Sequence, residues 1–501
     1  MTVYDTYRPE VAADDTGHGF QNWLAKARRG DDDWEPGTRP NPVIDRARFR
    51  DAVEEGFAPR RLQQLARPWS KPDIDVSNDT PERDPERPLL AMHDRRRLAL
   101  ERLAVTERPR RATRLNLFGS KRAPFWDVHR GPAPIGYYVL AVVITLFVIL
   151  GLVMVLSASA QTEVQKGRSP YFIFNRQLVW AGIGTIGLVI AMRVSLVWLR
   201  RLAVPLLAIA AAGMLAPFAP GLGVTLNDAR AWIAVGNFTL QPSEFLKLGL
   251  VIFAADLLVR RKDDLSDVRR SLKPLIMLAG FAAVACLGQG DLGSAIVMTA
   301  IVLAVAFIGG VPLIPLVATA VTAGGAALLF VFSSPRRYER FTAFLDITGH
   351  RDHLSYQTWQ GMMAMADGGL TGSGVGSGNA KMGYLPLAHS DFIFAVVADE
   401  LGFVGTVAVL GGFGLIVWFG IQAGLSSPDR FGMLLAGGIA GWFGVQAIVN
   451  TGGVSGLMPV TGLTLPFFSA GGSSLFISMT AAGLLLNVAR RGQLAKTRDR
   501  E

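Results

Sequence analysis

Apolar residues occur along this chain in long runs that are separated by short polar segments. A membrane-spanning helix needs about 20 predominantly apolar residues, and ten runs after residue 130 approach or exceed that length. Buried core helices of a soluble protein would carry long polar faces, and these runs do not. The pattern predicts an all-α, polytopic membrane protein with about ten transmembrane helices. The predicted spans are residues 136–157, 177–193, 201–218, 244–260, 273–288, 291–310, 312–333, 391–421, 431–450 and 467–489.

Residues 1–130 follow a different pattern, in which Pro, Arg and Asp dominate and large apolar residues are sparse. Such a segment cannot bury enough surface to offset its chain entropy, so we predict a largely disordered arm. Residues 89–105 are an exception, because they could form a short basic amphipathic helix on a membrane surface. A regulatory, partner-binding arm and a solvated tail both remain open. The predicted domains are the arm (1–130), a ten-helix membrane domain (136–490) and a short tail (491–501).

Basic residues set the predicted orientation, because loops rich in Lys and Arg stay in the cytoplasm. Residues 91–130 hold eleven Arg and Lys against four acids, which places the N-terminus and, after ten spans, the C-terminus in the cytoplasm. The first apolar run begins too late for a cleaved signal peptide. The net charge of +10 fits basic flanks beside anionic lipid and requires no nucleic acid. The protein is therefore expected in the cytoplasmic membrane.

The loop between the seventh and eighth predicted helices, residues 334–390, breaks this rule. It is predicted to lie outside the cell, yet it is rich in basic residues. An anionic ligand is one explanation, and weak control of long loops by the positive-inside rule is the other. Its glycines (368–378) permit positive φ and close approach to a ligand, and backbone amides with basic side chains suit a phosphorylated one. The basic residues are Arg336, Arg337, Arg340, Arg351 and Lys381.

Charged residues also occur inside the apolar runs, where they are costly unless they face a cavity or a partner. Pro242 suits the first turn of a helix, and the helix dipole favours Glu244 in that turn. Capping therefore explains Glu244, but it does not explain Lys247, which would face into a membrane. Asp291 lies at a tight turn between two runs, where helix capping is again the alternative to a function. Cys286, as the only cysteine, excludes an intrachain disulfide.

Five segments, in order, resemble the SEDS family (shape, elongation, division and sporulation) of FtsW/RodA-type proteins. The resemblance covers residues 136–490 and favours the FtsW-like division branch over the RodA-like one. The segments are NDARAWI…QPSEFLK (227–247), similar to NGARxWI…QPSExxK; GQGDLGSA (288–295), to QPDLGTA; YQTWQGMMAMADGG (356–369), to YQxxQSxxAIGSGG; YLPLAHSDFIFAVVADELGFVG (384–405), to YLPExHTDFIFAVxxEExGFxG; and GLMPVTGLTLPFFSAGGSS (456–474), to GLLPTxGLxLPFxSYGGSS.

The resemblance implies a glycosyltransferase that polymerises lipid II into peptidoglycan glycan strands at the outer face of the cytoplasmic membrane. It further implies a class B penicillin-binding protein as transpeptidase partner, together with other division or elongation proteins. The attacking hydroxyl needs a base and the pyrophosphate leaving group needs positive charge. A lipid II flippase and a catalytically weak division scaffold are the alternatives. No metal ligands are predicted, although a divalent cation (Mg²⁺ or Mn²⁺) beside the pyrophosphate is chemically sensible.

The resemblance also implies the site residues. The family's essential carboxylate precedes the YQ motif in LDPxxDPxGxGYQ, and the corresponding text here is LDITGHRDHLSYQ. The transfer is ambiguous, and we prefer Asp352 to Asp346 as the catalytic residue. The chain departs from the family pattern at Leu387, Gly361 and Asp399. The expected substrate-binding residues are Arg176, Arg230, Glu244, Lys247, Asp291, Arg337, Arg340, Lys381, His389, Asp391 and Glu400.

Overall fold

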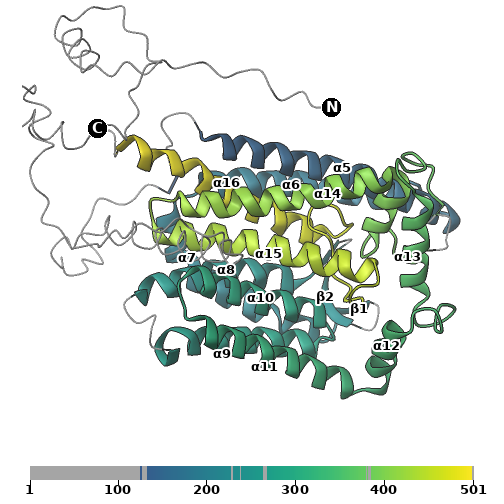
Figure 1. Cartoon of the computed structure of the whole chain (residues 1–501), viewed down its shortest axis with the longest axis horizontal. Helices are drawn as coiled ribbons and strands as arrows, with labels where there is room; N and C mark the ends of the chain where they lie inside the picture. Colours follow the sequence, from purple (N-terminus) through teal and green to yellow (C-terminus); the bar gives the residue numbers. More distant parts are fainter. Residues whose placement is uncertain are drawn as a thin grey trace, which may run out of the picture. The chain divides into compact units, whose positions relative to one another are not determined.

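The structure is a computed structural model, and it describes residues 125–126, 133–226, 229–236, 238–262, 268–379, 381 and 385–498 (Figure 1). The predicted arm over residues 1–85 and the predicted amphipathic helix over 89–105 lie outside these described residues. The boundaries of the predicted domains stay predictions.

Ten helices of the described part correspond, one for one, to the ten predicted spans. Seven are long and apolar enough to cross a membrane, and two more, within α9 and α10, are apolar but shorter. The tenth, α8, is set apart by its charged residues, among them Glu244, Lys247 and Asp256. The predicted fold class is therefore confirmed. The helices are α5 (Ile135–Gln165), α6 (Phe172–Arg193), α7 (Leu196–Gly213), α8 (Pro242–Arg260), α9 (Val268–Gly288), α10 (Leu292–Ile308), α11 (Leu313–Phe332), α14 (Ile393–Leu425), α15 (Arg430–Val454) and α16 (Gly472–Arg498).

The helices form a bundle in which α15 and α16 lie at the centre. Of their most apolar stretches, 78% and 83% of the residues are buried, against 11% for α11 at the periphery. On one side, α16 packs on α6, and α5 packs on α14; on the other, α10 lies between α9, α11 and α15 (Figure 1). Helices suit this setting because each one satisfies its own backbone hydrogen bonds without water.

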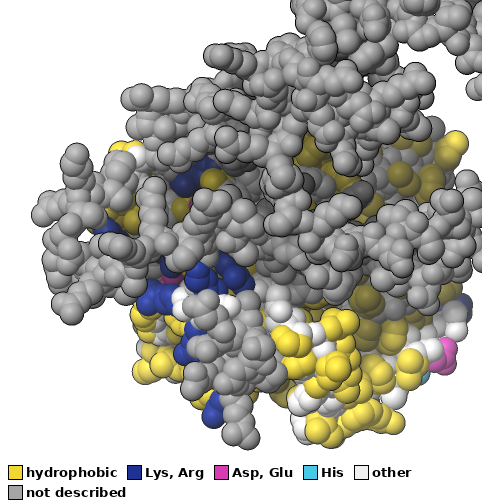
Figure 2. All heavy atoms as spheres, turned by 60° about the vertical axis from the view of Figure 1, so that its left-hand side comes forward, with side chains coloured by type: hydrophobic (Ala, Val, Ile, Leu, Met, Phe, Trp, Pro, Cys, Tyr) yellow, Lys and Arg dark blue, Asp and Glu magenta, His cyan; other side chains and the backbone are white. Residues whose placement is uncertain are grey.

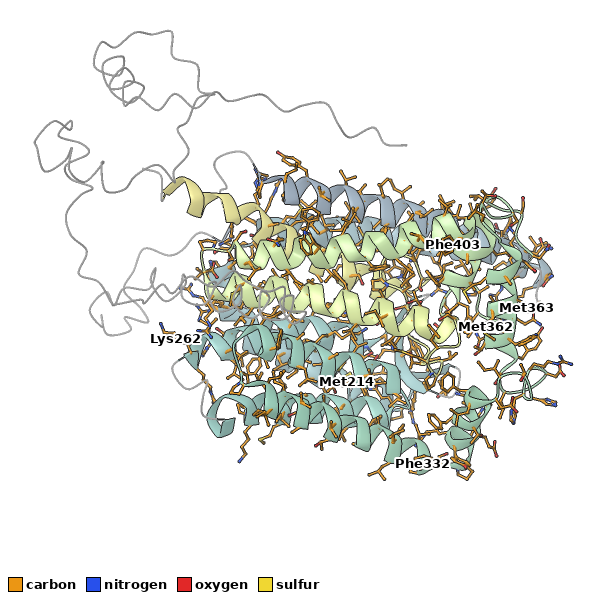
Figure 3. The ribbon with its side chains drawn as sticks, viewed as in Figure 1. Met214, Lys262, Phe332, Met362, Met363 and Phe403 are labelled. Carbon is orange, nitrogen blue, oxygen red and sulfur yellow. The ribbon has the colours of Figure 1, made fainter. Side chains whose placement is uncertain are left out.

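The two ends of the bundle differ. One end, which we call the loop end, carries the short helices α12 (Pro335–Leu345) and α13 (Tyr356–Asp367) and a small sheet (Figure 1). At the opposite end, which we call the basic end, Lys and Arg side chains gather (Figure 2). Phe332 lies toward the loop end and Lys262 at the basic end (Figure 3). At the basic end, the buried carboxylate of Asp256 is paired with Arg200 at 3.0 Å and Arg260 at 2.7 Å.

A three-stranded antiparallel sheet at the loop end was not predicted from the sequence. It consists of β1 (Gly223–Leu226), β2 (Ala229–Val235) and β3 (Phe238–Leu240), in the order β1-β2-β3. Two contacts anchor the sheet to the bundle: Arg230 Nε donates to the Pro217 carbonyl in the 3₁₀ helix η1 (Ala216–Phe218) at 2.8 Å, and its backbone N–H to the Gln289 carbonyl at 3.0 Å. The sheet therefore closes the loop end over α7 and the α9–α10 junction.

Helix α14 is interrupted at Gly402, whose φ of 65° and ψ of −164° are not helical. A loop before the helix supplies the hydrogen bonds that the break removes. The N–H groups of Phe403 and Val404 donate to the carbonyls of Gly369 and Leu370 at 2.9 and 3.1 Å. In return, the N–H groups of residues 373 and 374 donate to the carbonyls of residues 399 and 400. The loop and the helix are thus joined through their backbones.

Candidate functional site

The first of two buried ion pairs joins a loop residue to α14. Lys381 Nζ lies 2.9 Å from Glu400 Oε1 and 3.1 Å from Ser157 Oγ on α5. Ser157 Oγ in turn donates to the same Glu400 oxygen. The Lys381 side chain is only 8% exposed and that of Glu400 is fully buried, so the pair exists in a setting of low dielectric. Two predicted substrate-binding residues therefore meet here and neutralise one another.

The glycine-rich loop wraps around this pair. The other Glu400 oxygen, Oε2, accepts a hydrogen bond from the Gly376 N–H at 3.0 Å. A side chain at Gly378 would begin 2.5 Å from the Asp399 carboxylate. These glycines let the loop backbone approach α14, whereas the sequence predicted a close approach to a ligand.

The second ion pair lies within α8. Lys247 Nζ is 2.8 Å from Glu244 Oε1 and 3.2 Å from Gln446 Oε1 of α15. The indole N–H of Trp442 donates to the same Gln446 oxygen at 2.6 Å, and the Lys247 ammonium lies 5.7 Å from the centre of the Trp442 ring. Glu244 Oε2 is buried and has no hydrogen-bond partner. Lys247 is thus held by three groups inside the protein, and Glu244 keeps one buried oxygen without a hydrogen-bond partner.

Helix α15 fixes the Gly/Pro-rich segment before α16. Gln446 Nε2 donates to the Thr464 carbonyl at 2.8 Å, and Asn450 Nδ2 donates to the carbonyls of Leu463 and Asp391 at 2.7 and 2.9 Å. Irregular backbone at membrane depth requires such partners. The segment is therefore held by buried amide side chains.

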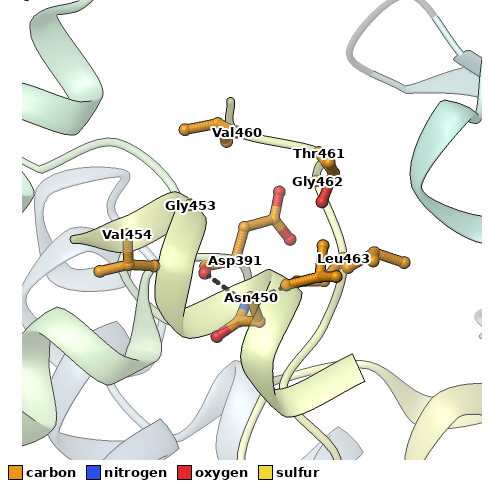
Figure 4. A pocket seen from close by; sticks show the side chains of 9 residues that line it. Asp391, Asn450, Gly453, Val454, Val460, Thr461, Gly462 and Leu463 are labelled. Atoms are coloured by element: carbon orange, nitrogen blue, oxygen red, sulfur yellow. Dashed lines mark hydrogen bonds between the residues drawn. The ribbon is translucent and has the colours of Figure 1, made fainter. Parts of the chain in front are cut away.

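Asp391 lines a small pocket between α15 and this segment, with only about 10 Å³ of accessible space (Figure 4). Its carboxylate points toward Thr461 and Gly462 (Figure 4). Desolvation raises the pKa of Asp391 to about 6, against the lowering effect of a hydrogen bond with Ser390, and the negative charge of Asp291 adds to the rise. Asp391 is therefore a carboxyl group that changes its charge close to neutral pH.

Asp291 has the helix-capping geometry that was the alternative to a function. Its Oδ1 accepts from the Ser294 N–H of α10 at 2.8 Å, and its Oδ2 accepts from Gln241 Nε2 at 3.1 Å. His389 lies beside the outermost turn of α5. Burial lowers its pKa, as does the nearby Lys166, whereas Glu163 raises it. A neutral imidazole is the favoured form at this position.

The two candidate catalytic acids lie in different environments. Asp346 ends α12, and its Oδ1 accepts from the Gly349 N–H at 2.9 Å and from Thr348 Oγ1 at 3.1 Å. These hydrogen bonds lower the pKa of Asp346. The side chain of Asp352 is 81% exposed and lies 3.7 Å from Arg351 Nε. Both residues are exposed, but the carboxylate of Asp346 stabilises a turn, whereas that of Asp352 lies beside Arg351.

The remaining predicted basic residues are spread over the loop end. Arg337 donates to the Phe330 carbonyl at 2.9 Å and stacks 3.7 Å from the Phe330 ring centre, which caps α11. Arg340 lies exposed on α12, and Arg176 is partly exposed near the start of α6. Arg230 binds backbone carbonyls, as described above. Within the described residues, no three His, Cys, Asp or Glu side chains come together as a metal site.

Three residues that contact the two ion pairs were not among the predicted site residues: Ser157, Trp442 and Gln446. Gln446 could have been found, because a lone amide in an apolar run is costly at membrane depth unless it has a partner. Trp442 gave no comparable signal, since tryptophan is common in such helices.

Comparison with known proteins identifies relatives of the membrane domain. The family model FtsW/RodA/SpoVE, described as "Cell cycle protein", matches residues 137–494. Stage V sporulation protein E of Bacillus subtilis is 37% identical over 354 residues, 70% of this chain and 96% of that protein. A probable peptidoglycan glycosyltransferase FtsW of Mycobacterium tuberculosis is 36% identical over 71% of this chain and 68% of that protein.

Two solved structures share the fold. One comes from work on the structural coordination of polymerization and crosslinking by a peptidoglycan synthase complex; it has a TM-score of 0.58 and 30% identity, and covers 71% of this chain and 98% of its own. The other is the Rod shape determining protein RodA of Thermus thermophilus, with a TM-score of 0.53 and 29% identity over 73% of this chain and 98% of its own. With the family model spanning the whole ten-helix bundle, this chain belongs to the FtsW/RodA/SpoVE family.

Proposed function

We propose that this protein is a peptidoglycan glycosyltransferase that polymerises lipid II during cell division, together with a class B penicillin-binding protein. The relatives named probable peptidoglycan glycosyltransferase FtsW support the activity. The observation that carries the assignment to residues is the exposed carboxylate of Asp352 at the loop end, in the same long segment of the chain that joins α14 through residues 369–374 and Lys381.

The loop end is the outer face in this proposal. Lys262 lies at the basic end (Figure 3), where α8 ends at Arg260 and Asp256 joins Arg260 to Arg200, and basic loops remain in the cytoplasm. Both termini are then cytoplasmic, and lipid II reaches Asp352 from the outer leaflet. A Mg²⁺ or Mn²⁺ ion would accompany the pyrophosphate of the substrate.

The reaction forms one bond and breaks another. The 4-hydroxyl oxygen of the incoming lipid II bonds to the anomeric carbon of the growing chain, while the bond from that carbon to the polyprenyl pyrophosphate breaks. Asp352 accepts the hydroxyl proton as general base. Positive charge stabilises the departing pyrophosphate, and Lys381 supplies it once the phosphate replaces Glu400 as its partner.

A lipid II flippase is the second candidate. The observation that favours it is the Glu244–Lys247 pair inside α8, with a buried carboxylate oxygen that has no partner, because polar groups within a bundle mark transport pathways. Translocation that survives the loss of Asp352, without polymer formation, would favour this candidate.

The test is polymerisation of labelled lipid II by the full-length protein with its transpeptidase partner. Asp352→Ala is expected to reduce the rate by at least ~100-fold through loss of the base, without a change in unfolding temperature. Asp346→Ala is expected to keep most of the activity and to loosen the turn after α12. Asp367→Ala, which removes an exposed acid at the end of α13, is the matched control. Normal polymerisation by Asp352→Ala would reject the assignment.

A further inference from the structure

An apolar groove runs between α5 and α14, which pack side by side (Figure 1). It holds about 480 Å³ of accessible space. Leu146 and Leu415 are exposed on its walls, and Phe147 fills its floor, where the ring packs against Gly412. Gly411 leaves open space above the backbone, because a side chain there would meet no atom within 4 Å. The groove is therefore a slot that is deepest at a glycine.

The groove lies at the depth of the hydrocarbon core. Both helices are longer than a span requires, with 31 residues in α5 and 33 in α14. At 1.5 Å per residue, Leu146 is about 16 Å from the basic end of α5, and Gly411 about 21 Å from that of α14. Ser157 and Glu400 lie about 33 and 37 Å from the same ends, just beyond a core about 30 Å thick.

The same two helices therefore carry a charged cluster at the membrane edge and an apolar slot below it. Ser157 of α5 and Glu400 of α14 hold Lys381 between them. The surface between cluster and slot is apolar, with Phe403 and Val407 exposed on α14 (Figure 3). Once a phosphate replaces Glu400 as the partner of Lys381, as in the proposed reaction, this arrangement suits an amphiphile that has an anionic head at the membrane edge and a long, thin apolar chain.

We propose that the α5–α14 groove binds the polyprenyl chain of the lipid-linked substrate and holds its pyrophosphate next to Lys381. The inference rests on the proposed function, whose donor and acceptor are both polyprenyl pyrophosphates. A helix of a partner protein is the other occupant to consider. Close packing of membrane helices uses small residues, and the exposed Ala408 and Gly411 would suit such a helix. We favour the polyprenyl chain because the same two helices hold Lys381 at the membrane edge, and the test below distinguishes the two occupants.

The test compares Gly411→Phe with Gly414→Phe in the full-length protein. Both glycines are exposed on α14 with open space around them, but only Gly411 lines the groove. The substrates are lipid II with an undecaprenyl chain and lipid II with a farnesyl chain, which is too short to fill the slot. Gly411→Phe is expected to raise the KM for undecaprenyl lipid II about tenfold, equivalent to ~1.4 kcal/mol. The KM for farnesyl lipid II should stay unchanged, and Gly414→Phe should behave like wild type.

A second measurement separates this inference from the proposed function. Native mass spectrometry of detergent-purified protein reports retention of undecaprenyl pyrophosphate without any polymerisation. If Gly411→Phe loses undecaprenyl pyrophosphate and Gly414→Phe keeps it, the groove is supported. This holds even if the wild-type protein makes no polymer, a result that would reject the proposed function alone. Equal retention and equal KM values in both variants overturn the groove. So does loss of the co-purified transpeptidase in Gly411→Phe with chain-length preference intact, since a partner helix would then occupy the slot.

Discussion

Lys381 Nζ lies 2.9 Å from Glu400 Oε1 in a site that water hardly reaches. Breaking a buried ion pair by removing one partner leaves an uncompensated charge and costs about 3–5 kcal/mol. We therefore expect Lys381→Met to lower the stability of the purified protein by about 3 kcal/mol and to abolish polymerisation. Thermal unfolding in detergent, alongside the lipid II assay, measures both effects.

The double variant Lys381→Met, Glu400→Gln is the control for this pair. Because no charge remains buried, its stability should recover most of the loss, whereas its activity should not, if Lys381 binds the pyrophosphate. Recovery of both would show that the pair is purely structural.

The pH dependence of stability should report Asp391. Its pKa is about 6 in the folded protein and ~3.9 in an unfolded chain, so between these values the folded state holds more protons. Stability must then fall as the pH rises through this window and stay lower above it. At pH 8, the free energy of unfolding of Asp391→Asn should exceed that of wild type by at most ~3 kcal/mol, which appears as a higher unfolding temperature. This difference should vanish near pH 4. A difference that is independent of pH would contradict this assignment.

Gly402 should be intolerant of any side chain. Its φ of 65° costs another residue about 1–2 kcal/mol, and a Cβ would collide with the backbone of Leu370 and Gly372. Gly402→Ala is expected to destabilise the protein by at least ~2 kcal/mol in thermal unfolding. Gly414→Ala, in open space within regular helix, is the control and should be neutral or stabilising by ~0.5 kcal/mol.

At the basic end, we predict that removing the two arginine partners of Asp256 costs more stability than removing its carboxylate. Asp256 is buried, whereas the side chains of its partners Arg200 and Arg260 are 38% and 59% exposed. Removal of the carboxylate lets both guanidinium groups return to water, so Asp256→Asn should cost only about 1 kcal/mol. Arg200→Gln with Arg260→Gln leaves a buried carboxylate unpaired and should cost about 3 kcal/mol. Equal unfolding temperatures for the two variants would argue that water reaches Asp256.

Much of the bundle could be predicted because a span is a local signal. Even α8 was found, because its run is apolar apart from a few charged residues. The sheet was missed because its strands are short, with seven residues in β2. A short strand forms only where it finds hydrogen-bond partners on other strands, and sequence periodicity does not show those partners. α12 and α13 were likewise read only as loop.

The site was less predictable, because its contacts join distant parts of the chain. Ser157 and Glu400 are 243 positions apart, and nothing in either segment indicates the other. Sequence spacing also left the choice between Asp346 and Asp352 ambiguous, with Asp352 preferred. Their different environments follow from the turn over residues 346–349, which engages the carboxylate of Asp346 and does not include Asp352.

The backbone hydrogen bonds that join the loop to α14 around Gly402 limit how these two segments can move. Four backbone hydrogen bonds tie residues 369–374 to residues 399–404, and all four would have to break before the two segments could separate. A movement that shifts this part of the loop must therefore carry the first half of α14 with it. The loop and that half-helix therefore move as one rigid unit, and any hinge must lie outside residues 369–374 and 399–404.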